Sequence, residues 1–364
     1  MFNETFRTTD IRRIAIVGSG LSGLTSAIKL KQQGHEVTVF EKSRGPGGRL
    51  AAKRVGEGSA DIGAQYFTSR NPDFLPFLTE FAGDSSFAIW DGQFGFHSSD
   101  GQWQAFPDEL RYVGTPRMTA ISRALSAHAT VVSETRIESL AQFDGGWVLS
   151  DTHGKQVGEF DQVIITAPPA QARDLLAQSN LPELAAQLDD AVSRVLPCWA
   201  VAAHFEENPW PRHEGMRCEH PVLYWAANNS SKPGRKNVAQ EGKGAWWVLH
   251  ANPQWTERNV ETPPEQVAKE MVAAFRELTG TQVAVTDTVP HRWLYARSEG
   301  GANPGHLWFP KQGIGIAGDW LSGGRVEGAF DSACSLVSAC TENPVSRSCL
   351  ARYLLCCLGG CRSG

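Results

Sequence analysis

The sequence lacks several features that would place it in a broad class at once. Its 34 Lys and Arg residues do not outnumber its 39 Asp and Glu residues, which argues against a nucleic-acid partner. No apolar run approaches the roughly 18 residues that would suggest a membrane span, and residues 1–13 are polar, unlike a secretory signal. We therefore expect a cytoplasmic protein with neither a nucleic-acid nor a membrane partner, and the sequence leaves its oligomeric state open.

Cysteine pairs of the kind that hold structural metals are also missing. Six of the eight cysteines fall within the last 31 residues, from Cys334 to Cys361, without paired Cys-x-x-Cys spacing. We therefore expect free thiols and no metal site. Residues 341–364 are expected to form a poorly ordered tail, either native or the product of an altered reading frame.

Glycine, by contrast, is abundant, with 36 residues, and much of it occurs in motifs. Residues 14–17 form a short apolar run typical of a buried parallel strand, and the sequence Gly18-Ser19-Gly20-Leu21-Ser22-Gly23 follows directly. In such a motif Gly18 permits a tight turn, Gly20 allows close approach to a diphosphate, and Gly23 allows the following helix to pack on the strand. The motif predicts a dinucleotide-binding βαβ unit.

Later motifs favour FAD over NAD. Glu41 ends the next apolar run, where a carboxylate can accept hydrogen bonds from a ribose, and this favours FAD or NAD over NADP. A second glycine-rich turn, at residues 45–48, precedes Arg49, which can pair with a phosphate. Residues 315–319 are typical of a short strand that ends in Gly-Asp, and a helix is expected to begin after Gly324.

Together these motifs resemble the FAD-dependent amine oxidase superfamily over about residues 13–330. Within it, residues 63–68, 114–118, 290–293 and 318–320 resemble the bacterial renalase family. The resemblance implies an α/β fold with a Rossmann-like FAD-binding domain of the glutathione reductase type and a discontinuous α+β substrate domain of mixed or antiparallel sheet. The FAD-binding domain is expected at 11–71, 114–171 and 285–340, and the substrate domain at 72–113 and 172–284.

The resemblance also implies roles for cofactor-binding residues. Asp319 would hold ribityl or phosphate oxygens, the backbone of Ile137 would meet the adenine, and the helix at Val326 would direct its N-terminus at the flavin. FAD would be noncovalent, because Gly300-Gly301 precedes Ala302 rather than a cysteine. The expected cofactor-binding residues are Gly18, Ser19, Gly20, Ser22, Gly23, Glu41, Lys42, Gly48, Arg49, Gly63, Ala64, Gln65, Ile137, Gly318, Asp319, Arg325, Val326 and Glu327.

The reaction implied is hydride transfer from 2- or 6-dihydro-NAD(P) to flavin N5, with oxygen as the final acceptor and hydrogen peroxide as product. Such a substrate is already a hydride donor, so no catalytic residue beyond the flavin is required. The expected partners are thus a small-molecule dinucleotide and oxygen. The expected substrate-binding residues are Gln65, Tyr66, Phe67, Thr68, Ser69 and Trp293.

Other interpretations stay open. Eight of the 12 Trp residues lie between Trp199 and Trp308, and both core filling and an aromatic cleft account for them. His250 and His291 are expected to be structural. Residues 228–244 are expected to form an exposed loop, and residues 267–278 an amphipathic helix. The alternative functions are an oxidase of small amines, an oxidase of ordinary 4-dihydro NAD(P)H, and a non-catalytic redox module that binds FAD or NAD.

Overall fold

The computed structural model describes residues 11–235 and 244–341. The first of its two large sheets has six strands in the order β19–β20–β13–β1–β2–β9. All neighbours pair in parallel except β19 with β20. The strands span Arg13–Val17 (β1), Glu36–Phe40 (β2), Thr130–Val132 (β9), Gln162–Ile165 (β13), Leu307–Phe309 (β19) and Ile314–Ile316 (β20). The predicted strand at 14–17 is therefore confirmed.

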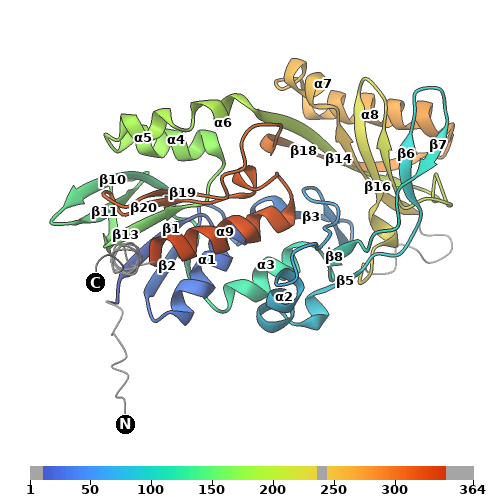
Figure 1. Cartoon of the computed structure of the whole chain (residues 1–364). Helices are drawn as coiled ribbons and strands as arrows, with labels where there is room; N and C mark the ends of the chain where they lie inside the picture. The colour runs from blue at the N-terminus through green and yellow to red at the C-terminus, as the bar shows by residue number, and fades with distance from the viewer. Residues whose placement is uncertain (1–10, 236–243, 342–364) are drawn as a thin grey trace, which may run out of the picture.

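Helices and a small sheet cover the two faces of this six-stranded sheet (Figure 1). On one face lie α1 (Leu21–Gln32) and α9 (Val326–Thr341), which bury Ile14 and Ile16 completely. On the other lie a three-stranded sheet and three helices. They are β10 (Ile137–Phe143), β11 (Gly146–Asp151), β12 (Gln156–Phe160), α4 (Pro169–Gln178), α5 (Pro182–Ala186) and α6 (Asp189–Ser193).

The second large sheet has seven strands in the order β18–β14–β17–β16–β15–β6–β7 and is antiparallel except for the β15–β6 pair. Its strands span β6 (Phe94–His97), β7 (Trp103–Ala105), β14 (Val195–Phe205), β15 (Gly215–Cys218), β16 (Leu223–Asn228), β17 (Ala245–Ala251) and β18 (Val285–Ser298). Helices α7 (Pro253–Arg258) and α8 (Pro264–Thr279) pack against it. The amphipathic helix predicted at 267–278 lies within α8.

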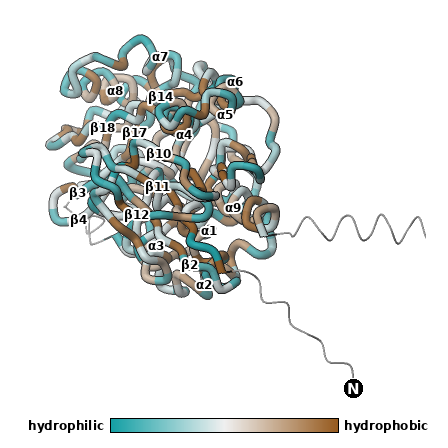
Figure 2. Tube along the Cα trace, turned by 90° about the vertical axis from the view of Figure 1, so that its left-hand side faces the viewer, coloured by the Kyte–Doolittle hydropathy of each residue, from teal (hydrophilic) through white to brown (hydrophobic). Residues whose placement is uncertain are grey.

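Smaller elements join the two large sheets. They are η1 (Gly48–Leu50), β3 (Ala52–Val55), β4 (Gly58–Asp61), α2 (Phe74–Ala82), η2 (Asp84–Ser86), β5 (Phe87–Ile89), β8 (Tyr112–Gly114), α3 (Thr119–Ser126), η3 (Asn229–Ser231) and η4 (Asp319–Leu321). Apolar and polar segments alternate along the tube in Figure 2. No helix within the described residues is long and apolar enough to cross a bilayer.

The sheet pairing changes one expected domain boundary. Residues 285–298 were expected in the FAD-binding domain, but β18 pairs with β14 along the edge of the seven-stranded sheet. This segment therefore goes with the second sheet, and the boundary moves to about residue 298. The remaining boundaries stay predictions, and all but the first residue of the tail expected at 341–364 lies outside the described residues.

Candidate functional site

A cavity of about 1120 Å³ is lined by residues of both large sheets. On the six-stranded side the lining comes from the ends of β1 and β2, the turn at 45–49 and the residues that follow β20. On the seven-stranded side it comes from β14, β15, β16, β17 and β18. The carboxyl ends of parallel strands, together with the N-terminus of α1, therefore open into this space, as they do in dinucleotide-binding folds.

The first glycine motif has the geometry that its spacing predicts. Gly18 has φ +108°, a conformation that other residues rarely adopt. A Cβ on Gly23 would lie 2.0 Å from the carbonyl oxygen of Gly18, so only glycine allows α1 to pack this closely. A Cβ on Gly20 would meet nothing within 4 Å, and Gly20 lines the cavity. The turn thus leaves bare backbone facing the space where a diphosphate would lie.

Glu41 fixes this turn to the end of β2. Its carboxylate is buried and accepts hydrogen bonds from the Ser19 backbone N–H at 3.0 Å, from Ser19 Oγ at 2.7 Å and from the Ser43 N–H at 2.8 Å. A carboxylate has about four acceptor positions, so capacity for a ribose hydroxyl remains. Ser19 itself lies behind the cavity wall, and its contribution is to hold the turn.

A charged pair joins the second glycine-rich turn to η4, the short helix that follows β20. Arg49 forms an ion pair with Asp319, and both residues line the cavity. Gly63 packs against this turn so closely that a Cβ would lie 2.1 Å from the Arg49 carbonyl oxygen. The three residues come from distant parts of the chain and meet at one point of the wall.

Most of the expected cofactor-binding residues lie along the cavity, and three do not. Those in the wall are Gly18, Gly20, Ser22, Glu41, Lys42, Gly48, Arg49, Gly63, Ala64, Gln65, Ile137, Gly318, Asp319, Arg325 and Val326. Ser19, Gly23 and Glu327 lie outside it. The Glu327 carboxylate accepts hydrogen bonds from the backbone N–H groups of Arg70 and Asn71, both at 2.6 Å, so it ties α9 to that turn.

The expected substrate-binding residues divide in the same way. Gln65, Tyr66 and Trp293 line the cavity. Phe67 was expected beside them, but it is 3% exposed and stacks on Tyr112 at a centroid distance of 5.6 Å. Its backbone also bridges to Tyr112. Tyr66 thus lies in the cavity wall and the next residue, Phe67, in the core.

Thr68 and Ser69 also lie outside the cavity lining. The chain turns away from the cavity after Phe67, and Ser69 Oγ donates to the backbone carbonyl of Asn71 at 3.3 Å. Of the expected substrate-binding residues, three thus line this cavity.

One backbone carbonyl holds part of the wall together. Ile62 O accepts hydrogen bonds from His250 Nε2 at 3.1 Å and from Trp293 Nε1 at 3.0 Å. A carbonyl only accepts, so His250 carries its proton on Nε2 and leaves Nδ1 as an acceptor. Burial lowers the pKa of His250 to about 4, and burial likewise lowers the pKa of His291 to about 4. Both imidazoles are neutral at pH 7.

A buried ion cluster lies directly behind Gln65. Lys232 Nζ lies 3.1 Å from Asp61 Oδ2 and 3.0 Å from Gln65 Oε1, and Arg235 also pairs with Asp61. Burial alone would raise the pKa of Asp61, but Lys232 and Arg235 outweigh it and lower that pKa. Burial lowers the pKa of Lys232 to about 8, against the opposing effect of Asp61.

This cluster corrects the expectation of an exposed loop at 228–244. Lys232 is 2% exposed and Asn229 is also 2% exposed, while residues 236–243 lie outside the described part of the chain. One sequence signal pointed to the burial: Asp61 stands between Ala60 and Ile62, and a carboxylate in an apolar run needs a countercharge.

Cross-strand pairing adds residues that sequence reasoning missed. His250 pairs with Trp225, and Trp225 pairs with Arg217, in neighbouring strands of the seven-stranded sheet. All three line the cavity, as do Tyr224 and Arg297. No local motif marks these residues, because the register of four separate strands brings them together.

The cavity is richer in positive than in negative side chains. Its lining includes eight Lys or Arg residues and four Asp or Glu residues, although the whole chain has a formal net charge of −5. The four acidic residues are Glu41, Glu138, Asp174 and Asp319. None of them comes from the seven-stranded sheet, whose described residues supply Arg217, Arg292 and Arg297 to the wall. This charge distribution favours anionic ligands.

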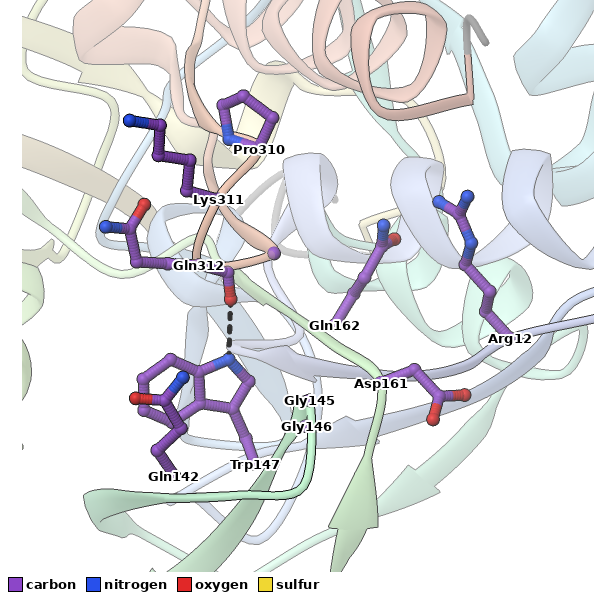
Figure 3. A pocket seen from close by; sticks show the side chains of 11 residues that line it. Arg12, Gln142, Gly145, Gly146, Trp147, Asp161, Gln162, Pro310, Lys311 and Gln312 are labelled. Carbon is purple, nitrogen blue, oxygen red and sulfur yellow. Dashed lines mark hydrogen bonds between the residues drawn. The ribbon is translucent and has the colours of Figure 1, made fainter. Parts of the chain in front are cut away.

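A second, smaller hollow of about 280 Å³ lies elsewhere on the surface (Figure 3). Its lining includes Arg12, Trp147, Asp161 and Gln312, and Trp147 Nε1 donates to the Gln312 carbonyl at 2.8 Å. None of the expected site residues lies in it. Within residues 11–235 and 244–341, no three His, Cys, Asp or Glu side chains gather as a metal site.

Comparison with known proteins gives family matches over most of the chain. A family described as NAD(P)-binding Rossmann-like domain matches residues 16–81. A second, described as flavin containing amine oxidoreductase, matches residues 103–340, which is more than half of the chain.

Curated relatives match over shorter stretches. The 1-hydroxycarotenoid 3,4-desaturase of Flavobacterium sp. (strain P99-3) is 41% identical over 58 residues, which are 16% of this chain and 12% of that protein. Coproporphyrinogen III oxidase of Mycobacterium tuberculosis is 27% identical over 208 residues, which are 51% of this chain and 45% of that protein. The chain thus spans less than half the length of these relatives.

Solved structures share the fold over nearly the whole chain. Cyclohexylamine oxidase from Brevibacterium oxydans IH-35A has a TM-score of 0.69 at 14% identity and covers 91% of this chain and 99% of its own. Wild-type putrescine oxidase bound to putrescine has a TM-score of 0.65 at 14% identity, and the match covers 91% of this chain and 98% of that one.

The cavity also fits the cofactor that this family uses. The bare backbone at Gly20, the acceptor Glu41 and the Arg49–Asp319 pair suit a diphosphate, a ribose and a polyol chain in turn. We conclude that FAD is the cofactor, and that the chain belongs to the flavin containing amine oxidoreductase family.

Proposed function

We propose that this protein oxidises 2- or 6-dihydro-NAD(P) to NAD(P)⁺. The substrate loses a hydride, and with one proton and one O₂ the overall products are NAD(P)⁺ and hydrogen peroxide. FAD supplies the hydride acceptor when bound. The contribution of the protein is to hold a flat dihydropyridine ring and an anionic dinucleotide beside it. Under this proposal the partners of the protein are the dinucleotide and oxygen, and the protein acts in the cytoplasm.

The observation that carries this proposal is the positive charge of the substrate-side wall. Arg217, Arg292 and Arg297 line the cavity from the seven-stranded sheet. Arg292 pairs with Glu261 and Arg297 with Glu299, whereas no carboxylate among the described residues pairs with Arg217. A dinucleotide has a negatively charged diphosphate and gains from this field. An alkylammonium ion entering the same space would be desolvated beside like charges, so a cationic amine is disfavoured.

The wall between these arginines and the Gly63 turn suits a flat ring. Tyr66 and Trp225 lie with ring centroids 5.6 Å apart, and Trp293 is held by its bond to the Ile62 carbonyl. His250 is neutral at pH 7, so its imidazole does not repel the pyridinium ring of the product. The oxidation yields an aromatic cation directly and therefore needs no general base from the protein.

Anaerobic reduction of the flavin tests the proposal. The FAD-loaded protein would be mixed in a stopped-flow instrument with 2-, 4- and 6-dihydro-NAD(P), with putrescine and with cyclohexylamine. We expect rapid bleaching of the flavin absorbance by the 2- or 6-isomer, with NAD(P)⁺ formed in equal amount. Bleaching by an amine alone, or by the 4-isomer alone, would replace the proposal. Loss of turnover with every reductant would favour a non-catalytic redox module.

A second candidate, oxidation of a porphyrinogen, is favoured by the same arginines. The chain is 27% identical over 208 residues to a coproporphyrinogen III oxidase, and a substrate with several carboxylates also suits a positive wall. Coproporphyrinogen III therefore belongs in the same reduction panel. Bleaching by it, with no response to any dihydronicotinamide, would establish this candidate instead.

A further inference from the structure

Two arginines share one tyrosine ring on the substrate-side wall. The guanidinium carbon of Arg297 lies 4.2 Å from the centroid of the Tyr224 ring, and that of Arg217 lies 5.4 Å from the same centroid. All three residues line the cavity. An aromatic ring attracts a guanidinium through its quadrupole, so Tyr224 stabilises both charges.

Neither arginine is fully neutralised by the described part of the protein. Arg217 is exposed, and its side chain has no ion pair or hydrogen bond there other than its contact with Tyr224. Arg297 pairs with Glu299 through one terminal nitrogen, while its buried Nε has no hydrogen-bond partner among the described residues. Two guanidinium groups that contact the same ring and line the same cavity suit the oxygens of a diphosphate.

The position of the pair relative to the ring-binding wall matches a nucleotide. Arg217 lies two strands away from His250 in one cross-strand row, with Trp225 between them. Neighbouring strands are about 4.8 Å apart, so the two backbones are separated by about 10 Å. In a dinucleotide a single ribose separates the nicotinamide from the diphosphate. The cross-strand row therefore offers a ring surface at His250 and Trp225, and a site for an anion about 10 Å away at Arg217.

We propose that Arg217, Tyr224 and Arg297 form the subsite that binds the diphosphate of the dinucleotide substrate. The proposal rests on the proposed function and adds a specificity determinant to it: the subsite selects dinucleotides over small uncharged dihydropyridines. Arg217 provides the unpaired charge, Arg297 provides the second guanidinium, and Tyr224 contacts both.

Binding to the FAD-loaded protein tests the subsite without turnover. Calorimetric titration with ADP-ribose and with inorganic pyrophosphate would be carried out on the unmodified protein and on Arg217→Met. The matched control is Arg258→Met, which removes an exposed arginine from α7 outside the cavity. We expect Arg217→Met to weaken ADP-ribose binding by about tenfold or more, and Arg258→Met to leave it unchanged. Binding should also weaken as salt is raised.

Kinetics on two substrates separates the subsite from a general effect on folding. For the reactive dihydro-NAD(P) isomer, Arg217→Met should raise KM with kcat little changed. For the matching 1-benzyl dihydronicotinamide, which has no phosphate, KM should not change. Retained FAD absorbance shows that the variant folds, and Tyr224→Phe should preserve binding because the ring remains.

The outcomes distinguish the subsite from the proposed function. If no dihydro-NAD(P) isomer reduces the flavin while ADP-ribose binding still depends on Arg217, the function is wrong and the anion subsite stands. If the isomers react but Arg217→Met changes neither ADP-ribose binding nor KM, the subsite is wrong and the function stands. Dependence on Arg217 for binding of coproporphyrin but not of ADP-ribose would also overturn the diphosphate assignment.

Discussion

The glycine turn on the cofactor side and the hydrogen-bonded wall on the substrate side are built from contacts at very different sequence distances. On the six-stranded side, the bond from Ser19 to Glu41 joins residues 22 positions apart, within one βαβ unit. On the seven-stranded side, the Ile62 carbonyl binds His250 and Trp293, which lie 188 and 231 positions away. The glycine turn of the cofactor side is thus a local structure that a short motif specifies, although the Arg49–Asp319 pair on the same side joins residues 270 positions apart. The substrate side depends throughout on the register of a large sheet. Substitutions on each side can show whether long-range contacts contribute more to the free energy of unfolding than the local turn does.

The largest effect is expected at the ion cluster that joins the two sides. Asp61 is completely buried and holds Lys232 and Arg235, so Asp61→Asn leaves two buried cations without a countercharge. We expect the free energy of unfolding to fall by about 3–5 kcal/mol. Denaturant unfolding monitored by tryptophan fluorescence and by flavin release would measure it.

A surface ion pair provides the control for Asp61. Asp190→Asn removes the partner of Arg194, and the Asp190 side chain is 79% exposed, so the cost should stay below about 1 kcal/mol. The double variant Asp61→Asn/Lys232→Met should recover part of the lost stability. Equal effects at Asp61 and Asp190 would show that the cluster does not join the two sides.

The next largest effect is a loss of folding stability at acid pH, and it arises from His250 on the substrate side. In the folded chain burial lowers the pKa of His250 to about 4, against 6.5 for a free imidazole. Between these two pH values the unfolded chain binds a proton that the folded chain does not, so stability rises with pH across this window. For His250 the loss by pH 4 is about 3 kcal/mol.

Urea unfolding at pH 4.5, 5.5, 6.5 and 7.5 measures this slope. His250→Gln should flatten it, and His291 contributes in the same direction because its pKa is also lowered to about 4. His153→Gln, on an exposed turn, controls for the loss of one imidazole. A slope that is unchanged in His250→Gln would contradict the assignment of acid sensitivity to this residue.

Two glycines on the cofactor side separate folding from FAD binding. A Cβ on Gly23 would lie 2.0 Å from the Gly18 carbonyl oxygen, so Gly23→Ala should cost about 1–3 kcal/mol by forcing α1 away from β1. In Gly20→Ala the methyl group enters open space at the cavity wall. Its stability should change by less than about 0.5 kcal/mol, while FAD affinity falls by roughly tenfold.

Thermal melting of the apoprotein and FAD titration would compare the two glycine variants. The expected pattern is loss of stability in Gly23→Ala and loss of affinity in Gly20→Ala. The reverse pattern would mean that the roles of the two glycines are exchanged.

The smallest effect is expected at Trp293. The change Trp293→Phe keeps an aromatic ring but removes the hydrogen bond from Nε1 to the Ile62 carbonyl, at a cost of about 1 kcal/mol. Chemical unfolding would measure this cost. Leu294→Ala, at an exposed position of the same strand, is a suitable control. A loss well above 2 kcal/mol would mean that the substrate wall is less tolerant of change than the glycine turn.

The sequence predicted the cofactor side well because its signals are local. The order of strand, glycine turn, helix and acid fixes where Gly18, Gly23 and Glu41 lie. Gly18 and Gly23 have the conformation and close packing expected of them, and Glu41 directly follows β2. The second sheet was harder because pairing between distant strands leaves no local pattern. Arg217 and Tyr224 therefore went unnoticed, and the polar residues around Lys232 resembled an exposed loop although they are buried. Phe67 directly follows Tyr66, and no local signal separates the ring in the cavity wall from the ring in the core.

The carbonyl of Ile62 has a consequence for how this site can change during evolution. The acceptor belongs to the main chain, so every amino acid at position 62 provides it, and mutation of that codon cannot delete it. Only the two donors, His250 and Trp293, are open to genetic variation. The acceptor of these two hydrogen bonds thus depends on the backbone, whereas the donors depend on which side chains stand at positions 250 and 293. Natural variation in the strength of the two bonds must therefore arise at the donors.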